Sequence, residues 1–218
     1  MKVTNKIDLR NCDNMSLMAE YEDNHFDLAI VDPPYGANDA IGIKQCKDHS
    51  KQATQRTNYK IFDNKEPSKD YFDELFRVSK SQIIWGANFY KNINLNGGMI
   101  CWDKKGTVFG RAELAYYSNS KSVNVFEYTW NGMLQEDMKN KESRIHPTQK
   151  PKALYKWLLQ NYAKEGDKIL DTHLGSGSIA IACHEMGFDL VGCELDEDYY
   201  KSMIDRFKVE TMQRDLFQ

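Results

Sequence analysis

Six short apolar runs limit how this chain can fold more than any other feature of its sequence. Most of them have no polar interruption, which is typical of β-strands that are covered on both faces. Helical patterns lie between several of the runs, at 151–163 and 196–210 for example. We therefore expect an α/β fold with an open, mostly parallel sheet and helices on both faces. The runs are residues 26–31, 81–85, 98–102, 113–117, 167–170 and 188–193.

The stretch 97–118 breaks this alternation, because two strand-like runs follow each other with only a glycine-containing link between them. Such a pattern predicts an antiparallel hairpin, which we place at one edge of the sheet. The length of 218 residues suits a single domain over residues 1–218.

Composition excludes several classes of protein. Charged residues make up 28% and hydrophobic residues 41%, which is typical of a folded globular chain rather than a disordered or fibrous one. No apolar run is long enough to cross a membrane and the first residues do not form a signal segment, so we expect a cytoplasmic protein without a membrane partner. The five cysteines are scattered without a C-x-x-C pair, which predicts reduced thiols and no metal site.

The segment "DKILDTHLGSGSIAIACHEMGFDLVGCELDEDYY" predicts a strand, a glycine turn, a helix, a second strand and an acid at its end. Gly175 and Gly177 permit a tight turn and a close approach of backbone to a ligand. Glu194 can accept both hydroxyls of a ribose, so an adenosine-containing ligand is implied. The turn also fits the G-x-G-x-x-A form used for nicotinamide dinucleotides, whereas Asp171 suits the ammonium and sulfonium end of S-adenosylmethionine.

The segment "FDLAIVDPPYGAN" joins a buried strand to a stiff, acidic turn. Asp32 follows the strand, so its carboxylate is expected at the carboxyl edge of the sheet, where open α/β folds bind ligands. Pro33 and Pro34 have fixed φ angles and no N–H groups, so they offer carbonyl acceptors without competing donors. This arrangement suits an exocyclic amino group, and Tyr35 can stack on the ring that carries it.

Four motifs, "DPPY", "DTHLGSGS", "GCELDEDYY" and "RIHPTQKP", together resemble the DNA methyltransferases that transfer a methyl group from S-adenosylmethionine to adenine N6 or cytosine N4. The catalytic tetrapeptide precedes the glycine turn, which resembles the circularly permuted beta class. Other segments are similar to short phage and prophage members. The resemblance implies a Rossmann-like methyltransferase fold.

The resemblance also implies the catalytic residues and the substrate. Asp32 and the Pro33 carbonyl would hold the target amine, with Pro34 and Tyr35 completing the set, after the base has flipped out of duplex DNA. Aspartate at the first position favours adenine N6, since cytosine-N4 members more often have serine there. Cytosine-N4 methylation of DNA and adenine-N6 methylation of RNA stay as alternatives.

The cofactor residues implied by the resemblance come from three parts of the chain. Thr172 and His173 stand where family members usually have proline and phenylalanine, which leaves the role of His173 open. The implied set is Asp13, Thr148, Gln149, Lys150, Asp171, His173, Gly175, Ser176, Gly177 and Glu194.

The distribution of charge and the length of the chain indicate which partners the protein binds. Although the net charge is -3, residues 41–60 carry five Lys and Arg side chains against Asp48 alone. We expect the stretch 36–60 to form a basic loop that contacts DNA, since the chain has no room for a separate target-recognition domain. A restriction-modification role in a bacterial or phage-infected cell follows from the resemblance, and a homodimer is left open. A nicotinamide oxidoreductase and an inactive binding module are the alternatives from other classes.

Overall fold

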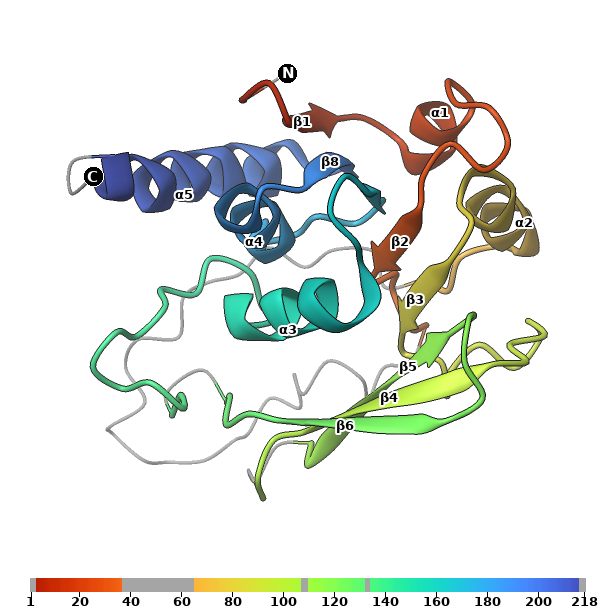
Figure 1. Ribbon diagram of the computed structural model, residues 1–218, viewed down its shortest axis with the longest axis horizontal. Helices are drawn as coiled ribbons and strands as arrows, with labels where there is room; N and C mark the ends of the chain where they lie inside the picture. The colour runs from red at the N-terminus through yellow and green to blue at the C-terminus, as the bar shows by residue number, and fades with distance from the viewer. Residues whose placement is uncertain (1–2, 37–64, 107–109, 132–133, 216–218) are drawn as a thin grey trace.

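The computed structural model describes residues 3–36, 65–106, 110–131 and 134–215 (Figure 1). Residues 37–60 of the predicted basic loop lie outside this set. The described strands form one sheet in the order β1-β8-β7-β2-β3-β5-β4-β6. Their bounds are β1 (Ile7–Asn11), β2 (Leu28–Val31), β3 (Gln82–Trp85), β4 (Gly98–Asp103), β5 (Ala112–Tyr117), β6 (Val123–Glu127), β7 (Lys168–Asp171) and β8 (Asp189–Glu194).

The sheet is mostly parallel, as predicted. β1, β8, β7, β2 and β3 pair in parallel, and among the described strands β5 alone runs antiparallel to both neighbours. The predicted hairpin is β4 with β5, in register from Gly98 opposite Tyr117 to Asp103 opposite Ala112. β6 adds a parallel strand outside this hairpin.

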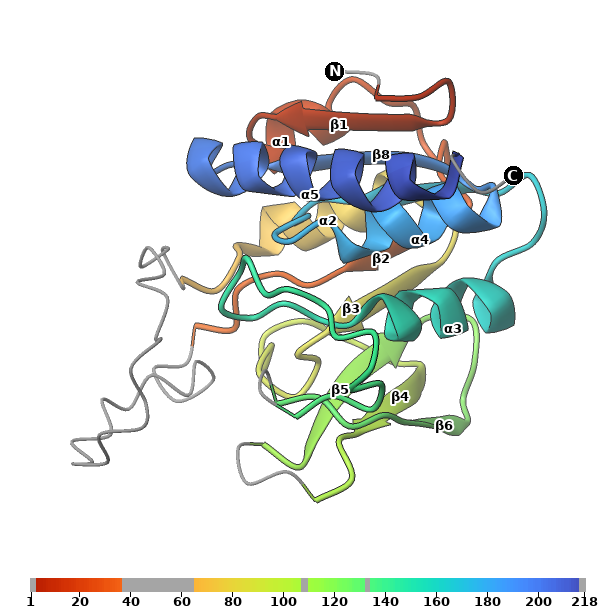
Figure 2. The same ribbon diagram turned by 90° about the vertical axis from the view of Figure 1, so that its left-hand side faces the viewer.

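Helices cover both faces of the sheet. α3 (Lys152–Tyr162), α4 (Ser178–Met186) and α5 (Glu197–Asp215) lie on one face, and α1 (Asn14–Met18) and α2 (Lys69–Val78) on the other (Figure 1). Figure 2 shows the three-helix face toward the viewer, with α5 and α4 in front of β8 and β2. The α/β fold predicted from the sequence is confirmed.

The core has two apolar clusters, one for each face. Along β2, Leu28 and Ile30 pack with the α3, α4 and α5 side chains, whereas Ala29 and Val31 pack with those of α1 and α2. All four β2 residues are buried, because side chains of a strand alternate between faces and both faces are covered here. This explains why the run that precedes Asp32 is continuously apolar.

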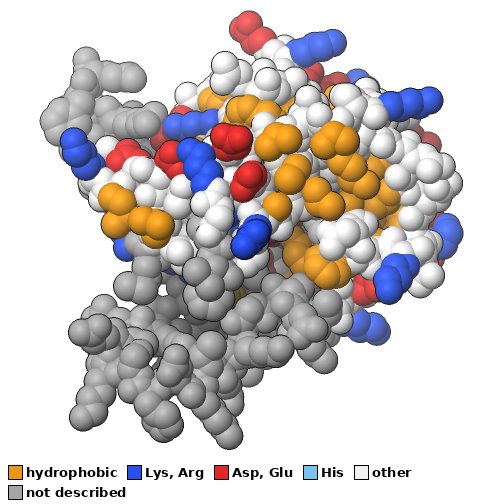
Figure 3. Space-filling view, turned by 90° about the horizontal axis from the view of Figure 1, so that it is seen from below, with side chains coloured by type: hydrophobic (Ala, Val, Ile, Leu, Met, Phe, Trp, Pro, Cys, Tyr) orange, Lys and Arg blue, Asp and Glu red, His pale blue; other side chains and the backbone are white. Residues whose placement is uncertain are grey.

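The β6 end of the sheet carries exposed hydrophobic side chains, among which Val123 and Val125 are 66% and 54% exposed. Figure 3 views the molecule from this end. Within the described residues, no helix combines the length and the apolar character needed to cross a bilayer.

Candidate active site

A cavity of about 530 Å³ opens where the parallel strands β1, β2, β7 and β8 end. The position follows from the topology, because parallel strands present their carboxyl ends at one edge. Of the predicted site residues, Asp171 and Gly177 do not line this cavity. The predicted residues that do line it are Asp13, Asp32, Pro33, Pro34, Tyr35, Thr148, Gln149, Lys150, His173, Gly175, Ser176 and Glu194.

Asp32 follows β2 directly, and two donors lie on its carboxylate. The Tyr35 hydroxyl donates to Oδ1 at 2.5 Å, and the Lys150 ammonium lies 2.5 Å from Oδ2. Burial and the negative charge of Asp32 raise the pKa of Tyr35, so this hydroxyl keeps its proton. Lys150, which was predicted in the cofactor set, lines the cavity, and its ammonium lies on the Asp32 carboxylate.

The Pro33 carbonyl also has a donor, since the Tyr90 hydroxyl lies 2.9 Å from it. A carbonyl oxygen has two lone pairs, so this bond leaves acceptor capacity. The proline segment is thereby anchored to the turn after β3, which carries Tyr90.

The Tyr35 ring is fixed by that same turn. Phe89 stacks on it with the ring centroids 5.0 Å apart and the planes 9° apart. Gly86 has a φ of +75°, and a Cβ at this position would lie 2.3 Å from the Tyr35 Cε1 atom. Gly86 is therefore required both by its left-handed backbone and by the closeness of the Tyr35 ring.

A second carboxylate reaches the same ammonium from β5. Glu113 Oε2 lies 3.2 Å from Lys150 Nζ, and Glu113 Oε1 pairs with Lys104. Two cations and two anions thus alternate from Lys104 through Glu113 and Lys150 to Asp32.

Asp171 ends β7 and is almost fully buried, with 1% of its surface exposed. It accepts a hydrogen bond from the His173 backbone N–H at 2.9 Å. Burial, with the nearby charges of Asp32 and Glu194, raises the pKa of Asp171 to about 8. The group therefore holds a proton over much of the neutral range.

Both ring nitrogens of His173 have partners in the wall of the cavity. Nε2 lies 3.2 Å from Asn14 Nδ2, and Nδ1 lies 2.9 Å from Thr172 Oγ1. Burial lowers the pKa of His173 to about 4, so the ring is neutral at neutral pH. The Tyr71 ring meets it edge-on with centroids 5.4 Å apart. His173 is thus a fixed, uncharged ring in the wall of the cavity.

The glycine turn is held by Glu194, which ends β8. Its carboxylate accepts the Gly175 N–H at 2.8 Å and the Asp196 N–H at 3.0 Å. Asp13, across the cavity, caps α1 by accepting the Ser16 N–H at 3.0 Å. These bonds orient both carboxylates and leave further lone pairs on each.

A buried arginine braces the turn from behind. Arg206 Nη1 donates to the Ser176 carbonyl and to Ser178 Oγ, both at 2.9 Å. At Gly177, φ is +70° and an added Cβ would lie 2.3 Å from Met203 Cγ, so the turn packs directly on α5. Ser176 and Gly177 therefore fix the conformation of the turn through their contacts with α5.

The segment with Thr148 and Gln149 makes most of its hydrogen bonds within itself. Thr148 Oγ1 lies 3.1 Å from His146 Nδ1, and the Gln149 amide binds Ile145 N–H at 3.0 Å and the Ser143 carbonyl at 3.1 Å. Trp130 Nε1 donates to the Gln149 carbonyl at 2.9 Å. The segment therefore covers the cavity as a preformed loop.

Sequence reasoning did not single out four residues that complete the site. Phe89 and Tyr90 lie in the "WGANFY" segment, whose resemblance to family members was the available signal. Glu113 lies in another segment with such a resemblance, "FGRAELAYYS", whereas only the fold brings Glu113 to Lys150 and Tyr155 to the cavity wall.

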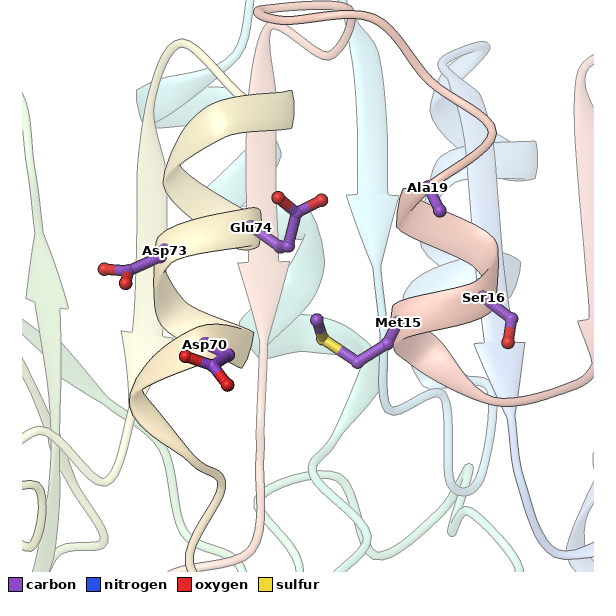
Figure 4. Close-up of a pocket in the computed structure, with 6 residues that line it drawn as sticks. All are labelled: Met15, Ser16, Ala19, Asp70, Asp73 and Glu74. Atoms are coloured by element: carbon purple, nitrogen blue, oxygen red, sulfur yellow. The ribbon is translucent and has the colours of Figure 1, made fainter.

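A second hollow lies away from this site, between α1 and α2 (Figure 4). Met15 and Glu74 point into the gap between the two helices, and Asp73 points away from it. None of the predicted site residues lines this hollow.

Known proteins are similar to this chain in sequence over most of its length. Residues 90–205, more than half of the chain, match the N6/N4 family model described as "DNA methylase". Type II methyltransferase M.HpaI of Haemophilus parainfluenzae is 25% identical over 247 residues, which cover 91% of this chain and 74% of that protein. Type II methyltransferase M2.DpnII of Streptococcus pneumoniae is 32% identical over 163 residues, covering 72% of this chain and 55% of that protein.

Solved structures share the fold at low identity. The PvuII cytosine-N4-specific DNA methyltransferase superposes with a TM-score of 0.61 and 12% identity, over 94% of this chain and 87% of that one. The M1.HpyAVI–SAM complex gives a TM-score of 0.54 and 16% identity, over 92% of this chain and 98% of that one. TTHA0409 of Thermus thermophilus, complexed with S-adenosyl-L-methionine, gives 0.55 and 19%, over 93% of each chain.

Proposed function

The chain belongs to the N6/N4 DNA methylase family, and from this premise we propose that it is a site-specific DNA methyltransferase acting on adenine N6. The observation that carries the proposal is the shared cavity of Asp32, Tyr35 and Glu194. Hydrogen-bond acceptors for an amine and hydrogen-bond acceptors for a ribose thus line the same cavity. The order of these motifs supports the permuted beta class.

S-adenosylmethionine is the methyl donor, and the charge of the cavity fits it. Lys150 is the cation among the lining residues, since burial lowers the pKa of His146 and of His173 to about 4. A cavity of this charge favours a ligand with ammonium and sulfonium groups over a dinucleotide with a pyrophosphate. The carboxylates that line it are Asp13, Asp32, Glu194, Asp196 and Glu197.

The residues that would hold this cofactor are Glu194 and the Gly175 turn on one side, with Asp13 and His173 on the other. When bound, the sulfonium supplies a methyl group that is already activated for transfer. Asp171 lies behind the cavity wall and acts through its charge once it has lost its proton. Its pKa of about 8 makes the cavity more negative as the pH rises.

The chain's own part in transfer is positioning. Asp32 and the Pro33 carbonyl accept hydrogen bonds from the two N–H groups of the target amine, which aims the nitrogen lone pair at the methyl group. When the C–S bond to the methyl group breaks and the N–C bond forms, the methylated nitrogen releases its surplus proton to solvent. The Tyr35 ring, rigid against Phe89, takes the place of a stacking neighbour for the flipped base. No covalent bond to the enzyme is needed.

The aspartate at the first position of the tetrapeptide favours adenine over cytosine. The relatives are type II methyltransferases of bacteria, which supports a restriction-modification role in a bacterial cytoplasm or during phage infection. The single domain over residues 1–218 stays a prediction, and whether the protein forms a homodimer stays open. Light scattering tests the oligomeric state.

The test is methylation of unmethylated genomic DNA with labelled cofactor, followed by digestion and mass spectrometry of the nucleosides. We expect N6-methyldeoxyadenosine, and no product from Asp32→Ala. N4-methyldeoxycytidine would overturn the choice of base, and label in structured RNA alone would overturn the choice of DNA. Sequencing DNA from expressing cells with detection of modified bases then gives the recognition site.

A further inference from the structure

The Lys150 ammonium lies between two carboxylates, at 2.5 Å from Asp32 Oδ2 and 3.2 Å from Glu113 Oε2. The Lys150 side chain is 3% exposed. The two carboxylates come from distant parts of the chain, the turn after β2 and the hairpin strand β5. One buried cation is therefore shared by an acid of the catalytic motif and by an acid outside it.

This sharing matters for the proposed function. The target amine must donate to Asp32, where Lys150 already lies. A buried ammonium that loses its carboxylate is strongly destabilised, so Lys150 can release Asp32 only toward another anion. Glu113 is that anion, since it already contacts the ammonium.

We propose that Glu113 is a positioning residue that takes over the Lys150 ammonium when the target amine binds Asp32. The inference rests on the proposed function. It concerns the step at which the amine of the target base gains Asp32 as its hydrogen-bond acceptor. Lys104 holds the other Glu113 oxygen, so Oε2 stays directed at Lys150. The charges of the cluster stay balanced through the exchange, because the cation moves between two anions and no proton is transferred.

The ionisation of Glu113 agrees with this role. Burial alone would raise the pKa of Glu113, but the charges of Lys150 and Lys104 outweigh it and lower the pKa to about 2. For Lys150, burial favours the neutral amine, yet Asp32 and Glu113 raise its pKa above the usual value. Both groups are therefore charged at every pH at which the enzyme would work.

The experiment measures single-turnover methylation of unmethylated genomic DNA with saturating cofactor. In Glu113→Gln, Lys150 keeps only Asp32 as an anionic partner and competes with the amine. We expect the rate to fall at least tenfold, with the dissociation constant for S-adenosylmethionine, measured by calorimetry, within threefold of the wild-type value. Glu136→Gln is the matched control, since Glu136 pairs with Lys105 outside the cavity, and it should leave the rate within twofold.

Repeating the Glu113→Gln substitution in a Lys150→Met variant separates this positioning role from a structural one. In Lys150→Met the competing ammonium is gone, so adding Glu113→Gln should change the rate by less than twofold. Equal losses in both backgrounds would overturn the proposal, as would an unchanged rate in Glu113→Gln or complete loss of transfer in Lys150→Met. Where Glu113→Gln does not fold, Glu113→Asp keeps the charge but shortens the reach, and an intermediate loss that depends on Lys150 is expected. An inactive wild-type protein would instead refute the proposed function.

Discussion

Asp171 shows how strongly its surroundings set the charge of a single side chain. Its burial behind the cavity raises its pKa to about 8, against an ordinary value of 3.8. The folded protein therefore binds a proton that the unfolded chain releases. Folding stability from this group is complete below pH 4 and is lost as the pH rises toward 8.

Asp171→Asn should remove this dependence, because an amide stays neutral and its oxygen can still accept the His173 N–H. We expect the variant to gain melting temperature over the wild type progressively from about pH 4 to about pH 8, with the difference constant above that. Thermal unfolding of both proteins across this range checks it. A difference that does not vary with pH would show that Asp171 is ionised when folded.

The affinity for S-adenosylmethionine should change with pH in the opposite direction to folding stability. In the wild type, binding of S-adenosylmethionine should tighten as the pH rises toward 8, because the ionised Asp171 attracts its positive groups. The Asp171→Asn variant should show a flatter profile by calorimetry. A steeper profile in the variant would contradict this.

The sequence predicted single residues of the site where each of them lies within a short motif. Asp32, Tyr35, Gly175 and Glu194 were predicted and do line one cavity. Lys150 was predicted and also lines this cavity, where its ammonium contacts Asp32 and Glu113. That contact joins three distant parts of the chain, so no local pattern could show it.

Among the elements, the turn after β3 requires a glycine at one position for two reasons. Gly86 and Gly106 both have a φ of +75°, but a Cβ at Gly86 would meet Tyr35 whereas one at Gly106 would meet nothing within 4 Å. Substitutions at these two glycines thus separate the cost of backbone strain from the cost of a steric clash.

Gly86→Ala should destabilise the protein by about 3 kcal/mol, since it combines the left-handed backbone with overpacking against Tyr35. Gly106→Ala should cost only about 1 kcal/mol, from the backbone alone. Urea unfolding of the two variants measures the difference. Methylation should fall in Gly86→Ala alone, because Tyr35 must shift; equal costs would show that the ring yields freely.

The strands that the sequence predicted are the inner strands of the described sheet. All six apolar runs form strands, and the helical patterns at 151–163 and 196–210 correspond to α3 and α5. β1 and β6 were not predicted, because they are the two edge strands and alternate between apolar and polar residues. Edge strands are paired on one side only, so the surrounding fold decides them more than their own sequence does.

On the scale of the whole molecule, the acidic net charge of -3 must be reconciled with binding to DNA. Among the charged side chains that line the described cavity, carboxylates outnumber the single lysine, and carboxylates repel phosphates. We propose that the basic stretch 36–60 supplies the attraction. It follows Asp32 and Tyr35 directly in the chain, which ties it to the catalytic turn.

Neutralising Lys44, Lys47, Lys51 and Arg56 together should weaken binding to DNA and reduce the dependence of log K on log salt by about 3 to 4, because each cation that pairs with a phosphate releases a counterion. Fluorescence anisotropy at salt concentrations between about 50 and 200 mM measures both the affinity and the slope. Binding of S-adenosylmethionine should stay unchanged. An unaltered slope would place the DNA contacts elsewhere.

The strand order has a consequence for the time at which the protein becomes active. β1 has β8 as its one strand partner among the described strands, and β7 lies between β8 and β2. A ribosome makes β1 and β2 early but releases β7 and β8 much later. Asp32 is therefore present long before Glu194, and the emerging chain holds a half-built sheet with open edges. Methylation can begin only after synthesis has passed β8, and until then the open edges expose the nascent chain to aggregation.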